Sequence, residues 1–271
     1  MARHAVRRPA AATALGHAQV GSDRRRSLLA MTLALVGIPV LLLDIGFGIL
    51  GMLAPSGADL DTRVAAISAS AGQTPLRVDE IPAEFAGAVV ATEDERFFSH
   101  HGLDSVGIAR SVWDDLNMGC LCEGGSTITQ QLAKVVYYPG QSAAVRKLPG
   151  MSVALKLEDR YSKSHLLAAY LSVVATGHGL LGARAAACAY FSHSLRELSA
   201  AEAAEIAGMI AAPSVYDPRR NPALAHSRRS YVLGRMVDQG LLTAAQAQAA
   251  DQSPLLLGGA RRAPASTGCA A

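Results

Sequence analysis

An unbroken apolar segment near the amino terminus places the strongest constraint on this chain. From Leu28 to Leu53 the sequence is apolar for about 26 residues, apart from Asp44. At about 1.5 Å per residue, a helix of this length spans a hydrocarbon core of about 30 Å. The segment exceeds the core of a cleaved signal peptide, which has about 7 to 15 residues, and no small-residue cleavage site follows it. We therefore predict a transmembrane helix over residues 27–54, in preference to a signal peptide or a buried core helix.

The charges that precede this segment predict its orientation. Residues 1–26 contain six arginines and one aspartate and show no hydrophobic period, so we predict a disordered basic tail. Arg24, Arg25 and Arg26 directly precede the apolar segment, and positive residues favour the cytoplasmic side. We expect a single-pass protein of the inner (cytoplasmic) membrane, with its amino terminus in the cytoplasm and its domain outside.

The rest of the chain has the composition of one helical domain. Half of the residues are hydrophobic, 5% are aromatic, and 51 of the 271 are alanine. Alanine favours helices, whereas sheets enrich aromatic and β-branched residues. We predict a mainly α fold, with a linker over 55–74, a domain over 75–250 and a frayed tail over 251–271. The net charge of +3 is too small to argue for nucleic acid as a partner.

Helix-start signals recur along the predicted domain. Ser199 and Glu202 form a capping-box pattern, and Pro222 follows Asn221 at the start of a helix that Gly240 can end. The predicted starts are Pro82, Ser126, Ser162, Ser199 and Asn221. No alternating strand pattern competes with them.

The first chemical motif lies at the end of an apolar helical pattern. Glu93 and Asp94 are followed by Phe97 and His100. Burial and a neighbouring like charge both raise the pKa of a carboxyl toward neutrality, which suits a general base. On spacing alone, a solvated helix end above a packed phenylalanine pair is the favoured alternative.

The second motif is a glycine turn that enters a helix, from Gly124 to Lys134. Free amides at a helix start and a lysine on a later turn can hold a phosphate. All four lysines, the others being Lys147, Lys156 and Lys163, fall between residues 134 and 163, which also hints at a phosphate site. The alternative is a well-capped helix with surface glutamines.

Together these motifs resemble the peptidoglycan glycosyltransferases of family 51. The pattern Glu-Asp-x-x-Phe-x-x-His-x-Gly begins at Glu93, and Gly-Gly-Ser-Thr-x-Thr-Gln-Gln runs from Gly124 to Gln131. Weaker matches extend the resemblance over about residues 75 to 245. It implies a lysozyme-like all-helical glycosyltransferase domain that polymerises lipid II in cell wall biogenesis. The implied partners are lipid II, the growing glycan strand, membrane lipid and other cell wall synthases; the chain lacks the motifs of a transpeptidase domain.

The resemblance also assigns roles within the site. It implies that Glu93 is the catalytic base. The implied substrate and pyrophosphate contacts are Asp94, Phe97, His100, Ser126, Thr127, Gln131, Lys134, Arg146 and Lys147. No residue is assigned to a metal, and the one candidate cofactor is a divalent cation (Mg²⁺ or Mn²⁺) bound with the substrate pyrophosphate. The cysteines, Cys120, Cys122, Cys188 and Cys269, lack zinc-ligand spacing and are given no role.

One departure from the family bears on activity. The third family motif is Arg-Lys-x-x-Glu, but after Arg146 and Lys147 this chain has Gly150 in the glutamate position. Glu158 and Asp159 lie more than two helical turns away, about 12 Å, and are poor substitutes. We expect reduced or lost activity with retained substrate binding, and a weakened local helix. A catalytically degenerate lipid II-binding or synthase-partner protein is the main alternative, and a lytic transglycosylase is disfavoured because a neutral glycan bond needs no cationic site.

Overall fold

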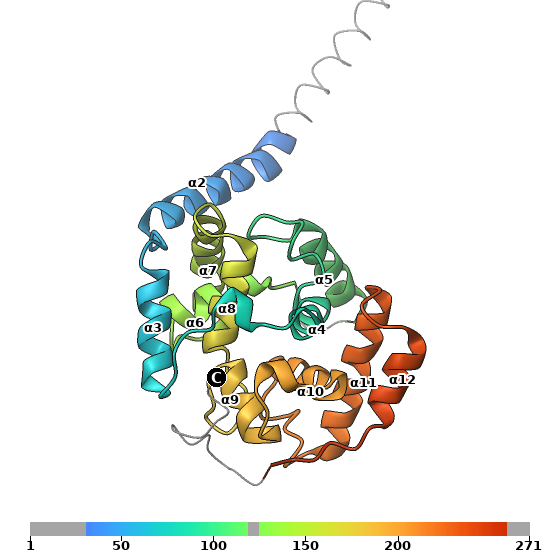
Figure 1. Ribbon diagram of the computed structural model, residues 1–271. Helices are drawn as coiled ribbons and strands as arrows, with labels where there is room; N and C mark the ends of the chain where they lie inside the picture. Colours follow the sequence, from blue (N-terminus) through green and yellow to red (C-terminus); the bar gives the residue numbers. More distant parts are fainter. Residues whose placement is uncertain (1–30, 119–124, 259–271) are drawn as a thin grey trace, which may run out of the picture. The chain divides into compact units, whose positions relative to one another are not determined.

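The computed structural model describes residues 31–118 and 125–258 and divides into two compact units, Met1–Leu53 and Ala54–Ala271 (Figure 1). The predicted basic tail over 1–26 and Gly124 lie outside the described residues, as do three of the four cysteines. The fourth, Cys188, is buried.

The first unit contains the predicted apolar helix. A π-helical turn, η1 (Leu33–Gly37), leads into α2 (Ile38–Leu53). The 20 residues Ala34–Leu53 have a mean hydropathy of 2.2, and none of the apolar window is buried in the protein. By length and composition this helix can cross a membrane.

The second unit is helical throughout its described part, where the only β features are two isolated bridges, His101 with Leu103 and Ala175 with Leu181. This confirms the prediction of a mainly α fold. The elements are α3 (Leu60–Ser70), η2 (Val78–Glu80), α4 (Ala83–Glu93), α5 (Ser105–Met118), α6 (Ile128–Tyr137), α7 (Ala143–Glu158), α8 (Lys163–Val173), α9 (Ala183–Ala186), η3 (Ala187–Phe191), η4 (Leu195–Glu197), α10 (Ala200–Ile210), α11 (Pro222–Asp238) and α12 (Ala244–Gln252).

Two helices form the centre of this unit. Every residue of α8 from Leu166 to Val173 is buried, and so is every residue of α10 from Ala201 to Ile210. Helix α6 packs between α7 and α8, whereas α4, α11 and α12 pack against α10 (Figure 1). The alanines of α10 leave little side-chain bulk between helices, so that these neighbours can approach closely.

Most predicted helix starts are present, but one is wrong. The Ser162 side chain accepts the N–H of His165 and Ser199 forms its capping box. Helix α6, however, is capped by Thr127 and not by Ser126. Thr127 Oγ1 accepts the Gln130 N–H at 3.1 Å and donates to the Gly102 carbonyl at 2.8 Å, and only the folded chain supplies that second partner.

Three further expectations differ from the structure. The segment predicted as a linker over 55–74 contains α3, whose Leu60 and Val64 are buried in the core of the second unit. Helix α7 continues through Pro149 and Gly150, since its packing against α6 supports a segment whose propensity is poor. The described part of the predicted frayed tail is also attached to the domain. Residues up to Gln252 belong to α12, and Gly258 donates to the Tyr190 carbonyl at 2.6 Å.

Candidate functional site

A cavity of about 790 Å³ opens in the second unit between the end of α4, the start of α5, α6, the start of α7, and α11. It is the place where the two chemical motifs meet. Eight of the ten predicted site residues line it: Glu93, Asp94, Ser126, Thr127, Gln131, Lys134, Arg146 and Lys147.

Glu93 is the last residue of α4, and its side chain is only 9% exposed. Gln131 Nε2 donates to Glu93 Oε2 at 3.0 Å, and Arg228 Nη2 lies 3.8 Å from Oε1. Burial raises the pKa of the Glu93 carboxyl, while the Gln131 hydrogen bond and the Arg228 charge oppose that shift. A carboxyl with a raised pKa that faces a cavity is a better proton acceptor for a bound hydroxyl than an ordinary glutamate.

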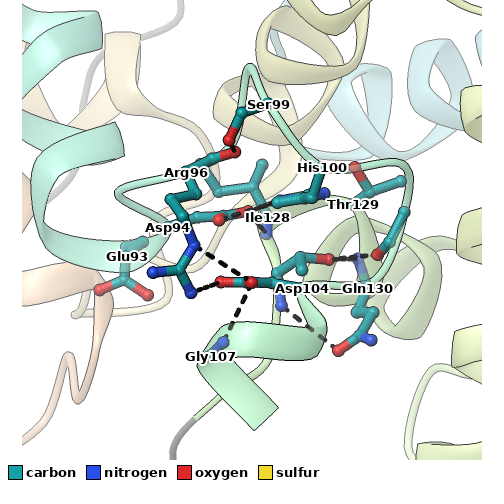
Figure 2. Close-up of polar contacts among 12 residues, drawn as sticks. Glu93, Asp94, Arg96, Ser99, His100, Asp104, Gly107, Ile128, Thr129 and Gln130 are labelled. Atoms are coloured by element: carbon teal, nitrogen blue, oxygen red, sulfur yellow. Dashed lines mark hydrogen bonds and ion pairs between the residues drawn. The ribbon is translucent and has the colours of Figure 1, made fainter. Parts of the chain in front are cut away.

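Asp94 has a different role from its neighbour. Its carboxyl, 2% exposed, accepts the Ile128 N–H at 2.9 Å and lies 2.9 Å from His100 Nε2. Figure 2 shows this carboxyl turned toward Ile128 and His100, and the Glu93 carboxyl pointing away from them. Asp94 therefore ties the end of α4 to the start of α6, which fixes Glu93 relative to Gln131.

Phe97 and His100, predicted as substrate contacts, do not line the cavity. Phe97 is fully buried, with the Lys163 ammonium 4.5 Å from its ring centroid. His100 is enclosed between Asp94 and Lys163, whose Nζ lies 3.3 Å from Nδ1. The motif supplied the right residue types, but the turn after α4 directs these two side chains into the core.

Three cations line the same cavity as Glu93, and we call them the cationic wall: Lys134, Arg146 and Lys147. Lys134 follows Gln131 by one helical turn, and its Nζ donates to Ser126 Oγ at 3.4 Å. In the described chain no carboxylate forms an ion pair with Arg146 or Lys147, and Arg146 Nε is buried without a hydrogen-bond partner. The wall can therefore receive an anion.

Only half of the lysine cluster belongs to this wall. Lys156 Nζ donates to the Ala54 carbonyl at 2.6 Å, and Lys163 pairs with Glu158 at 2.7 Å. Lys156 thus holds the chain at Ala54, and Lys163 neutralises a buried carboxylate. The hint of a phosphate site across all four lysines is therefore wrong for this pair.

Gly150 lies against the cationic wall. A Cβ atom at this position would be 3.1 Å from Lys134 Cγ, so the absence of a side chain leaves room for the stem of that lysine. Glu158 does not replace the missing carboxylate, because it is 2% exposed and accepts a hydrogen bond from Thr129 at 2.6 Å. Asp159 is exposed and lies 3.0 Å from His101.

Several cavity residues were not predicted from the sequence. Arg228, Tyr231 and Arg235 of α11 line the cavity, as does Glu95. Glu95 accepts from Arg110 at 2.7 Å and also from Arg235. The hydrogen bond from Arg110 and both arginine charges lower the Glu95 pKa. The arginine-rich sequence of α11 could have indicated these cavity residues, but the predicted site did not include that helix.

The described residues do not fit a protein-held divalent cation. They contain no group of three His, Cys, Asp or Glu side chains suited to a metal. Mg²⁺ binds through carboxylates together with substrate phosphates. Apart from Glu93, the carboxylates that line the cavity are Asp94, Glu95 and Asp104, and each already accepts hydrogen bonds from the protein.

Comparisons with known proteins agree on one family. The family model described as Transglycosylase matches residues 61–237. Penicillin-binding protein 1F of Bacillus subtilis (strain 168) is 40% identical over 173 residues, which cover 64% of this chain and 24% of that protein. Penicillin-binding protein 1A of Escherichia coli (strain K12) is 39% identical over 172 residues, covering 64% and 20%.

A crystal structure of penicillin-binding protein 1A from Haemophilus influenzae aligns with a TM-score of 0.42 and 23% identity, over 69% of this chain and 19% of that one. The chain thus spans about a fifth to a quarter of the length of the relatives that it matches.

Proposed function

Because the chain belongs to the transglycosylase family, whose model covers residues 61–237, we propose that it is a peptidoglycan glycosyltransferase that polymerises lipid II. Membership of the family confirms the resemblance drawn from the two motifs. One observation carries the proposed activity: a buried carboxyl, Glu93, and the cationic wall line the same cavity. These are the two kinds of group that glycosyl transfer from a lipid pyrophosphate requires.

The proposed reaction forms one bond and breaks another. The 4-hydroxyl of a lipid II attacks the anomeric carbon of the growing chain, and the bond from that carbon to the pyrophosphate oxygen breaks. Glu93 takes the hydroxyl proton, and the cationic wall balances the charge on the departing lipid pyrophosphate. One positioned group of this kind often contributes about 3 kcal/mol to transition-state stabilisation.

We assign the charge balance to Lys134, Arg146 and Lys147 and not to a metal held by the protein. The donor set of the cavity supports this choice, because its carboxylates are committed to neighbouring groups. A lytic transglycosylase is a poorer proposal, since cleavage of an uncharged glycan bond releases no pyrophosphate for the cationic wall to bind.

A binding protein without turnover is the second candidate, and Gly150 is the observation that favours it. The test is polymer formation from labelled lipid II by the native chain, Gly150→Glu and Gly150→Ala. We expect polymer from the native chain, and a rate higher by roughly one to two orders of magnitude in Gly150→Glu, the scale of one placed charge. Gly150→Ala adds only the Cβ beside Lys134 and is the steric control. Polymer from Gly150→Glu alone would establish the binding protein instead.

We also propose that α2 anchors the protein in the inner membrane, with the amino terminus in the cytoplasm. The apolar span Ala34–Leu53 supports the anchor, and Arg24 to Arg26 support the orientation. Deletion of residues 28–53 should release the protein from sedimented membranes into the supernatant. Deletion of residues 2–20 is the control and should leave it in the pellet. Sedimentation of the helix-deleted protein with membranes would contradict a single anchor.

A further inference from the structure

A buried tyrosine is connected to the proposed base, Glu93, through the Gln131 side chain. Tyr170 of α8 is fully buried, and its hydroxyl donates to Gln131 Oε1 at 2.6 Å. Among the described residues this is the only hydrogen bond of that hydroxyl. Burial raises the pKa of Tyr170 well above its ordinary value, so the hydroxyl keeps its proton and remains a donor at any working pH.

The Gln131 amide has two chemically different ends, and Tyr170 selects between them. With Oε1 held by the tyrosine, Nε2 faces Glu93 and donates to Oε2 at 3.0 Å. The reversed amide would leave the tyrosine proton without an acceptor in a buried site and would place Oε1 against the carboxylate. Both changes are unfavourable while Glu93 is ionised.

We propose that Tyr170 is a positioning residue for Glu93, which acts by fixing the orientation of the Gln131 amide. This proposal rests on the proposed function, because it gives the tyrosine its role at the same site. Without the hydroxyl, the amide can reverse and accept a hydrogen bond from protonated Glu93. Loss of the hydroxyl therefore favours the protonated carboxyl, and the base loses activity at a higher pH than in the native chain.

The other charged groups near Glu93 do not depend on the tyrosine. Arg228 of α11 lies 3.8 Å away, Asp94 follows in the chain, and Lys134 of α6 lines the same cavity. The remaining charged and titratable groups on α10 and α11, which pack against α4, are engaged elsewhere: Arg235 with Glu95 and Asp238, Arg229 with Glu205, His226 with Asp251, and Glu202 with Ser199. Removal of one hydroxyl leaves all of them in place.

The test measures the protonation of Glu93 directly, in the full-length chain in detergent micelles. The chain has nine glutamates, so labelling them with ¹³C at Cδ gives nine carboxyl signals, and the signal lost in Glu93→Gln identifies Glu93. In Tyr170→Phe we expect the Glu93 titration midpoint to rise by about 0.5 to 1 pH unit, the scale of one hydrogen bond. The acid limb of kcat/KM for lipid II polymerisation should move by the same amount.

The matched control is Tyr190→Phe. Tyr190 is also fully buried, and its hydroxyl donates to the Thr176 carbonyl at 3.3 Å, away from Glu93. Tyr190→Phe should leave the Glu93 titration midpoint and the acid limb of kcat/KM unchanged. In a Gln131→Leu background, Tyr170→Phe should produce no further shift, because the amide that connects the two groups is gone.

An unchanged midpoint in Tyr170→Phe, or an equal shift in Tyr190→Phe, would overturn the positioning role. A full shift of the Glu93 midpoint caused by Tyr170→Phe in the Gln131→Leu background would overturn it as well. If no variant and not even the native chain makes polymer, the proposed function fails, and the carboxyl titration still decides the role of Tyr170.

Discussion

Glu93→Gln should strongly reduce polymerisation of labelled lipid II, with a fall in kcat of about 10² to 10⁴-fold, the usual contribution of a positioned general base. Glutamine matches the shape of the native side chain but cannot take the hydroxyl proton. Lys134, Arg146 and Lys147 are unchanged, so lipid II binding should persist. A large loss of kcat with a nearly constant KM is the expected signature.

The control for this substitution lies on the same helix. Glu84 is exposed in the first turn of α4, and Glu84→Gln should retain native activity. The native pH profile provides a second check. Burial raises the Glu93 pKa. As the pH falls, activity should therefore be lost at a higher pH than the pH at which an ordinary glutamate becomes protonated. Undiminished polymer from Glu93→Gln would overturn the assignment of the base.

The helices were largely predictable because their signals are local. Alanine content, Pro222 at a helix start and the Ser199 capping box all act within one or two turns. The cap of α6 is the exception. Ser126 and Thr127 are adjacent residues with hydroxyl side chains, and both qualify as caps by sequence. The choice depends on the Gly102 carbonyl, which accepts a hydrogen bond from Thr127 and comes from a distant turn.

The site was predictable in its residue types but not in the direction of its side chains. Glu93 and Lys134 were expected at one site, and the structure places both in the same cavity. His100 belongs to the same motif as Glu93 yet contacts Asp94 in the interior. Tyr170 could not be assigned from sequence, because a tyrosine in a fully apolar helical pattern indicates core packing. Its link to the site is a contact across 39 positions of the chain.

The second large effect should appear in stability. Asp94→Ala should lower the free energy of unfolding by about 3 kcal/mol, because the Ile128 N–H and His100 both lose their acceptor in a buried site. For a domain of this size, that loss corresponds to a fall in Tm of about 6 to 12 °C. Thermal unfolding of the full-length chain in detergent, followed by circular dichroism, measures it.

The stability control is an aspartate with an exposed partner. Asp79 is 60% exposed and pairs with Arg77, which is 75% exposed, at 2.8 Å. Asp79→Ala should therefore change stability by no more than about 0.5 kcal/mol. Asp94→Asn should fall between the two, since its oxygen can still accept one of the two hydrogen bonds. A cost below about 1 kcal/mol for Asp94→Ala would mean that Asp94 does not tie α4 to α6, and the fixed position of Glu93 relative to the cationic wall would need another cause.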